Sequence, residues 1–96
     1  MRELGDAQAD RALDEDTLLR RRQVLGEDHP YTLQSATSLA IDLRLLGDLQ
    51  TARELDEDTV NRKRRVLGDD HPHTRISGSN LAEDLRLLGE DDDEGS

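Results

Sequence analysis

The clearest hydrophobic pattern in this chain is a stripe of leucines and alanines in residues 31–46. The apolar positions recur at spacings of three, one and three, which places them on one face of an α-helix. They are Leu33, Ala36, Leu39, Ala40, Leu43 and Leu46. The stripe predicts a helix over residues 31–46, and its alanines predict that a neighbouring helix approaches closely.

Capping residues and glycines predict three further helices. Asp6 is a good N-cap and Gly26 a good C-terminal glycine, so they predict a helix over residues 7–25. The same reasoning predicts helices over residues 49–67 and 72–88, with Asp28 or His29 capping the 31–46 helix. Only Gly47 and Asp48 separate the second predicted helix from the third. So short a link forces those two helices to run antiparallel.

The chain is built from one unit that occurs twice, at residues 4–45 and 46–87. The two copies carry the same residue at 26 of 42 aligned positions. A fixed period of this length is typical of a solenoid, in which each unit buries its apolar face against its neighbours. We therefore predict an all-α fold of antiparallel helix-hairpin repeats over residues 1–89. The acidic tail at residues 90–96 is expected to be disordered. Residues that recur in register are expected to serve packing or capping, and unique residues are better candidates for function.

Composition limits the class of function. The net charge of −10 disfavours nucleic acid and anionic membranes as ligands and favours a basic or mixed-charge protein partner. Tyr31 is the only aromatic residue, so we expect a thin aliphatic core and modest stability. Cysteine is absent, and the sequence holds neither a stretch of transmembrane length nor a signal peptide at its start. We expect a soluble cytoplasmic protein.

The charged positions favour ordinary helix electrostatics over catalysis. Asp16 with Arg20, and Asp58 with Arg62, have the spacing of stabilising ion pairs on one helix. The sequence holds no Walker loop, glycine-rich dinucleotide motif or Ser/His/Asp signature. We therefore expect no enzyme activity, no catalytic residues and no cofactor.

The repeated Asp-His-Pro loops suggest a metal site as an alternative. The candidate ligands are Asp28, His29, Asp70, His71 and His73. Zinc needs three or four convergent ligands, and successive loops of a solenoid lie too far apart to share one ion. We therefore expect capping and loop packing here, and no metal.

The segment from Leu39 to Ala52, Leu-Ala-x-x-Leu-x-x-Leu-Gly-Asp-Leu-x-x-Ala, resembles the tetratricopeptide repeat, whose usual period is about 34 residues. The Leu-Gly-Glu/Asp-Asp-His-Pro block at residues 25–30 and 67–72 is similar to the long, kinesin-light-chain-like type of that repeat, which is found in bacterial, especially actinobacterial, signalling proteins. That type usually carries Asn-Asn before Leu-Ala, whereas the present copies have Thr37-Ser38 and Ser79-Asn80. The resemblance implies a non-catalytic protein-binding module.

The resemblance also implies a concave groove lined by the second and fourth helices. The residues expected to line it are Gln34, Thr37, Ile41, Arg44, Ile76, Ser79, Asn80, Glu83 and Arg86. Arg44 and Arg86 recur in register, so they either bind a ligand carboxylate or pair structurally with Asp14 or Asp56. Two functions follow. In the first, the groove binds a peptide or helix of a partner protein. In the second, the chain, which holds one whole repeat between two half-repeats, forms a homo-oligomer by completing its helix stack.

Overall fold

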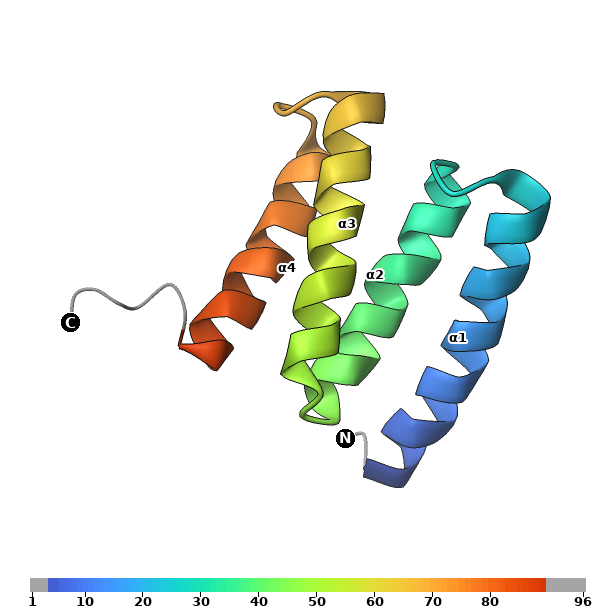
Figure 1. The fold of residues 1–96 in the computed structure, drawn as a ribbon, viewed down its shortest axis with the longest axis vertical. Coiled ribbons are helices and arrows are strands. Elements are labelled where there is room, and N and C mark those ends of the chain that lie inside the picture. The colour runs from blue at the N-terminus through green and yellow to red at the C-terminus, as the bar shows by residue number, and fades with distance from the viewer. Residues whose placement is uncertain (1–3, 90–96) are drawn as a thin grey trace.

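The computed structural model describes residues 4–89, and every element in that range is a helix. The helices are α1 (Leu4–Leu25), α2 (Pro30–Leu45), α3 (Leu49–Leu67) and α4 (Pro72–Leu88). They lie side by side in chain order, and neighbouring helices run antiparallel (Figure 1). The predicted all-α hairpin architecture is confirmed. The expected disorder of residues 90–96 concerns residues outside the described range.

The start of α1 is the boundary that differs most from the prediction, since each end of α2 differs from it by one residue. The helix begins at Leu4, and Asp6 lies in its first turn instead of capping it. A carboxylate in the first turn still interacts favourably with the positive end of the helix dipole. Asp6 is therefore compatible with either position, and its residue type could not decide between them.

The Asp-His-Pro blocks cap α2 and α4 in the same way. His29 and His71 are the N-caps, and each Nδ1 accepts a hydrogen bond at 3.1 Å from the backbone N–H two residues later. The proline that follows each histidine is the first helical residue, a position that needs no N–H donor. Of the two caps considered for α2, the histidine serves, and the predicted capping role of the recurring loop is confirmed.

Gly47 makes the short turn between α2 and α3. Its φ of +85° lies in the left-handed region that other residues avoid. The turn is closed by a 2.8 Å hydrogen bond from the backbone N–H of Asp48 to the carbonyl oxygen of Leu43. The predicted antiparallel pairing of α2 with α3 follows directly from this turn.

The core is thin and aliphatic, and the α2 stripe is at its centre. One buried cluster joins three helices and consists of Leu18, Ala36, Leu39, Leu43 and Ala52, with Leu55 packed against it. The remaining stripe residues Leu33 and Ala40 are also buried, and Leu46 is half-buried. The predicted buried face of α2 is confirmed.

The α3–α4 pair is held mainly by polar side chains. Val60 of α3 is buried there, but most buried neighbours are polar. They are Asp56, Thr59, Lys63, Thr74, Ser77 and Asp84. Leu81 and Leu85, the repeat equivalents of Leu39 and Leu43, are only half-buried. The last helix is therefore attached through fewer apolar contacts than the others.

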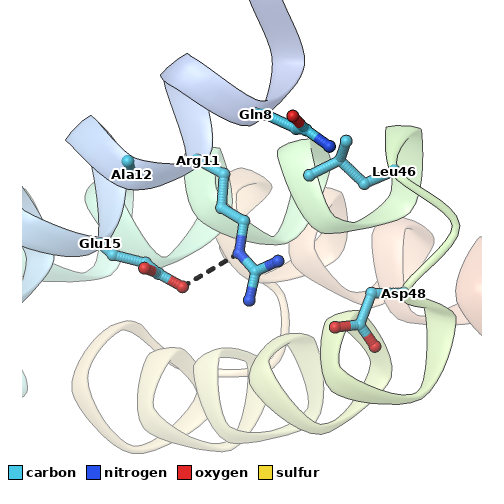
Figure 2. Close-up of a pocket in the computed structure, with 6 residues that line it drawn as sticks. All are labelled: Gln8, Arg11, Ala12, Glu15, Leu46 and Asp48. Carbon is cyan, nitrogen blue, oxygen red and sulfur yellow. Dashed lines mark hydrogen bonds and ion pairs between the residues drawn. The ribbon is translucent and has the colours of Figure 1, made fainter. Parts of the chain in front are cut away.

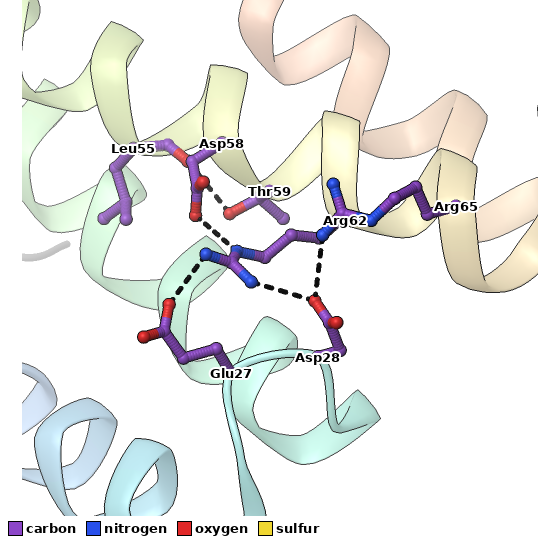
Figure 3. A network of polar contacts seen from close by, with 7 residues as sticks. All are labelled: Glu27, Asp28, Leu55, Asp58, Thr59, Arg62 and Arg65. Atoms are coloured by element: carbon purple, nitrogen blue, oxygen red, sulfur yellow. Dashed lines mark hydrogen bonds and ion pairs between the residues drawn. The ribbon is translucent and has the colours of Figure 1, made fainter.

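A cluster of ion pairs ties the first interhelical loop to α3 (Figure 3). Arg62 donates to Glu27 at 2.7 Å, to Asp28 at 2.9 Å and to Asp58 at 2.8 Å. Hydrogen bonds with Asp58 and Asp28 raise the pKa of Arg62 above its usual range. The predicted pairs Asp58–Arg62 and Asp16–Arg20 are both present. Arg62 therefore pairs with Asp58 on its own helix and also links successive repeats through Glu27 and Asp28.

Candidate functional site

A pocket of about 450 Å³ lies among three of the helices. Figure 1 shows the α1–α2 loop and the α3–α4 loop at the same end of the molecule. The wall of the pocket comes from the start of α2, the end of α3 and the start of α4. The lining residues are Pro30, Tyr31, Gln34, Thr37, Ser38, Lys63, Val66, Leu67, His71, His73 and Ile76. Apolar side chains alternate with polar ones, which is the usual make-up of a binding site for part of a ligand.

Three of the nine predicted groove residues meet in this pocket. Gln34 and Thr37 reach it from α2, and Ile76 reaches it from α4. Gln34 is exposed, Ile76 is 56% exposed, and the hydroxyl of Thr37 donates to the carbonyl oxygen of Leu33. The pocket therefore lies between the two helices that were expected to line the groove.

The other predicted groove residues lie further along α2 and α4, outside this pocket. Ile41 is 39% exposed and Ser79 is exposed. Asn80 and Glu83 are half-buried, and Glu83 forms an ion pair with Arg86. These residues occupy the side of the predicted groove nearer the Gly47 turn, where Arg44 is also found.

Arg44 belongs to a buried ion-pair network. Its Nε donates to Asp84 at 2.7 Å, and its Nη2 lies 3.3 Å from both Asp56 and the carbonyl oxygen of Asn80. The two carboxylates are almost wholly buried, and the Arg44 side chain is 19% exposed. Of the two roles considered for Arg44, the structural pairing with Asp56 is present, and Asp84 is a second partner that the sequence reasoning missed.

The network holds two acids beside one base. Burial and the neighbouring carboxyl of Asp84 raise the pKa of Asp56 to about 8, against the lowering effect of Arg44. No donor among the described residues reaches Oδ2 of Asp84. A proton on Asp56 gives the carboxylate of Asp84 a donor and removes one of the two buried negative charges.

Lys63 is the lining residue that the sequence analysis should have singled out. It is the one lysine in a run of arginines, and its repeat equivalent is Arg21. Only 9% of Lys63 is exposed, and burial lowers the pKa of its ammonium group. The difference between the copies was the available signal, because unique residues mark candidate functional positions. Its burial could not be foreseen, since a basic run on a helix is usually solvated.

A second hollow of about 460 Å³ lies between α1 and the α2–α3 turn (Figure 2). Arg11 and Glu15, both on α1, form a 3.1 Å ion pair on one side of the hollow. Leu46 and Asp48 form the opposite side. Its polar groups belong to different helices and do not converge on one point, so it offers no evident ligand site.

The histidines do not assemble a metal site within residues 4–89, where no group of three or more potential ligands comes together. The rings of His71 and His73 are stacked with centroids 5.3 Å apart, and Nδ1 of His71 is occupied by its capping hydrogen bond.

The fold defines a helical-repeat protein whose successive helix hairpins share one stack. Comparison with known families finds a match to the tetratricopeptide repeat at residues 1–31 and 32–73. The match covers most of the sequence, so the chain belongs to the tetratricopeptide repeat family. Its second match runs over 42 residues, the period of the repeat in this sequence, and takes α2 and α3 together.

The family generally mediates protein–protein interaction and is generally non-catalytic. No curated protein and no solved structure matches the chain. Among the helices of residues 4–89, none combines the length and the apolar character needed to cross a bilayer.

Proposed function

We propose that this chain is a non-catalytic interaction module that presents the groove between α2 and α4 to an extended peptide or helix of a partner protein. The convergence of Gln34, Thr37 and Ile76 on one pocket carries this proposal. A volume of about 450 Å³ suits one or two side chains of a ligand, which makes the pocket an anchor point in a longer contact.

The rest of the groove supplies the remaining contacts. Ile41, Ser79 and Glu83 lie further along the same two helices and are accessible to a ligand that continues past the pocket. Arg44 supports this surface from below by fixing α2 against Asp84 of α4. Arg86, which is 60% exposed, takes the direct role in contacting ligand carboxylates that was considered for both arginines.

Site-specific photo-cross-linking tests the groove. A benzophenone amino acid replaces Gln34 in one variant and Asn61 in the other. Both positions are exposed, and Asn61 lies about 200° around α3 from the pocket residue Lys63. The position-34 variant is expected to yield an adduct that mass spectrometry maps to one segment of one cellular protein. Equal labelling of that segment from both positions would reject the groove.

We further infer that the repeat is of the long, kinesin-light-chain-like type found in actinobacterial signalling proteins. The 42-residue period and the capping His-Pro pair in both loops support this inference. The histidine caps keep the start of α2 and the start of α4 in the same geometry. The repeat period thereby sets the spacing between α2 and α4, the two walls of the proposed groove.

Self-association is the second candidate function, and exposed apolar positions at both ends of the stack favour it. Leu13 of α1 is 64% exposed, whereas its repeat equivalent Leu55 packs against the buried cluster. On α4, Leu81 and Leu85 are left half-buried. A second copy placed one repeat further on would pack its Leu13 against these two leucines, as Leu55 packs against Leu39 and Leu43.

Charge complementarity supports the same arrangement. Arg86 and Asp14 are the repeat equivalents of Arg44 and Asp56, so a head-to-tail contact would reproduce the observed Arg44–Asp56 pair between two molecules. Such an interface is heterologous and can extend into a chain of copies.

Sedimentation over about a hundredfold range of concentration tests this candidate. The mean mass is expected to rise with concentration for the unaltered chain and to stay at one copy for L13D. Because Leu13 is mostly exposed, L13D should leave the fold intact. A single-copy mass for the unaltered chain throughout the range excludes self-association.

A further inference from the structure

Lys63 is a largely buried cation with no ion-pair or hydrogen-bond partner among residues 4–89. Its side chain extends from α3 to line the pocket, and 9% of its surface is exposed. Within residues 4–89 its ammonium group forms no ion pair and no hydrogen bond; only the longer-range field of Asp56 acts on it. A buried lysine is ordinarily compensated by an anion or by several acceptors, because desolvating a charge is costly.

The first repeat shows how the same position is satisfied when it carries arginine. Nη1 of Arg21 donates to the carbonyl oxygen of Tyr31 at 2.8 Å and to the hydroxyl of Ser35 at 2.9 Å. Its guanidinium carbon also lies 5.5 Å from the centre of the Tyr31 ring. In the first repeat this cation therefore joins α1 to α2.

The second repeat keeps one of these acceptors but does not use it. Ser77 is the equivalent of Ser35, and its buried hydroxyl oxygen has no partner among the described residues. Both hydrogen bonds of Arg21 come from Nη1, and Lys63 forms no equivalent of either within residues 4–89. At the α3–α4 interface, Ser77 is therefore left without the hydrogen bond that Ser35 receives from Arg21 in the first repeat.

The composition of the pocket is also unusual for this chain. The sequence has 23 acidic and 13 basic residues, yet no carboxylate lines the pocket. Because Nδ1 of His71 accepts a hydrogen bond, a neutral His71 ring carries its proton on Nε2 and is a donor there. The amide of Gln34 and the hydroxyl of Ser38 add further donors. The pocket therefore provides a positive charge and several donors for a negatively charged acceptor.

We propose that Lys63 binds the side-chain carboxylate of an aspartate or glutamate in the partner segment that occupies the groove, a proposal that rests on the proposed function. A carboxylate carries one negative charge, which matches the single ammonium of the pocket. A phosphate group carries nearly two. Val66, Leu67 and Ile76 provide the apolar part of the wall, so the residue next to the acid in the ligand is apolar. The site thus selects an acidic residue although the whole chain is strongly negative.

Two blocked dipeptides test the site directly. The probes are N-acetyl-leucyl-glutamate amide and its glutamine counterpart, which differ in charge but hardly in shape. In an NMR titration of the ¹⁵N-labelled chain, the glutamate probe is expected to shift the amide signals of His71, His73 and Ile76 to saturation. The glutamine probe should bind at least about tenfold more weakly. Equal binding of the two probes overturns the proposal.

Two substitutions at Lys63 separate charge from geometry. K63Q removes the charge and is expected to abolish the preference for the glutamate probe. K63R keeps the charge, but its guanidinium can donate to the hydroxyl of Ser77, as Arg21 donates to that of Ser35. K63R should therefore also lose most of the preference for the glutamate probe, and it should unfold at a higher temperature than the unaltered chain. Retention of the full preference in K63Q, with signals outside the pocket unchanged, contradicts the assignment.

The same titration distinguishes this proposal from its alternatives. A phosphoserine probe that binds more than about tenfold tighter than the glutamate probe would reject the carboxylate in favour of phosphate. Failure of the dipeptides leaves the cross-linking at Gln34 unaffected, because that experiment does not depend on charge. The anion site can therefore fail while the groove stands, and a failure of the groove itself is seen separately, in the cross-linking.

Discussion

At the scale of single residues, Arg44 joins three helices. It extends from α2 and contacts Asp56 of α3 and Asp84 of α4, two carboxyl groups that are almost fully buried. The whole network contributes little net free energy to folding, because burying its charges is costly. Removing one partner destabilises the fold by more than that, because the remaining charges stay buried without compensation. Arg86 occupies the same position in the next repeat but forms an exposed pair with Glu83.

These two arginines form a matched pair for mutation. R44A is expected to lower the free energy of unfolding by about 3 kcal/mol, since it strands buried acids. R86A should change it by less than about 0.5 kcal/mol, as is usual for exposed pairs. Urea denaturation followed by circular dichroism measures both. Equal effects of the two substitutions would show that the buried network does not hold α4.

Asp56 makes stability depend on pH. Its folded-state pKa of about 8 lies above the ordinary value of 3.8, so the folded chain binds this proton more tightly than the unfolded chain does. The resulting stabilisation is fully present below about pH 4 and is lost as the pH rises through about 8. We therefore expect the melting temperature to be higher at pH 5.5 than at pH 8.5.

D56N is the control for this effect. Asparagine keeps a donor for Asp84 and an acceptor for Arg44 but does not titrate. The variant should lose most of the difference in melting temperature between pH 5.5 and pH 8.5, and it should be the more stable protein at pH 8.5. An unchanged pH dependence in D56N would assign the effect to other groups.

At the scale of elements, α2 and α4 are the same helix in different surroundings. Leu43 is 1% exposed between α1 and α3, whereas its equivalent Leu85 is half-buried. The α3–α4 interface substitutes polar contacts for apolar ones. The stack is consequently firmest around α2, and α4 is the helix most easily released.

Truncating the two leucines measures this difference. L43A is expected to cost about 3 kcal/mol, because it leaves a cavity in the buried cluster, and L85A less than about half as much. Thermal unfolding of the two variants provides the comparison. If L85A were as costly as L43A, Leu85 would be as deeply buried in solution as Leu43, and α4 would not be the more loosely attached helix.

The sequence predicted the helices better than the contacts between them. The α2 stripe, the His-Pro caps and the Gly47 turn depend on residues close together in the chain, and all three are present. The Arg44–Asp84 pair joins residues 40 positions apart. Its identification needed the placement of α2 relative to α4 across α3, which local spacing does not provide.

At the scale of the whole molecule, charge is distributed unevenly. The chain carries a net charge of −10, which would steer a basic partner toward it, yet the pocket between α2 and α4 has no acidic lining residue. A partner segment that combines basic residues with one acidic anchor satisfies both features. Composition alone predicted the first feature, and only the folded arrangement of α2, α3 and α4 shows the second.

The most direct test of the account compares two exposed apolar residues, one on the last helix and one on the first. Ile76 is 56% exposed and lines the pocket, whereas Leu19 is 55% exposed and its repeat equivalent is already asparagine. The affinity of the partner segment identified by cross-linking is measured by calorimetry for I76N and L19N. I76N is expected to weaken binding at least about tenfold, and L19N to leave it within about twofold. Equal affinity of I76N and the unaltered chain would contradict the groove between α2 and α4 as the site of interaction.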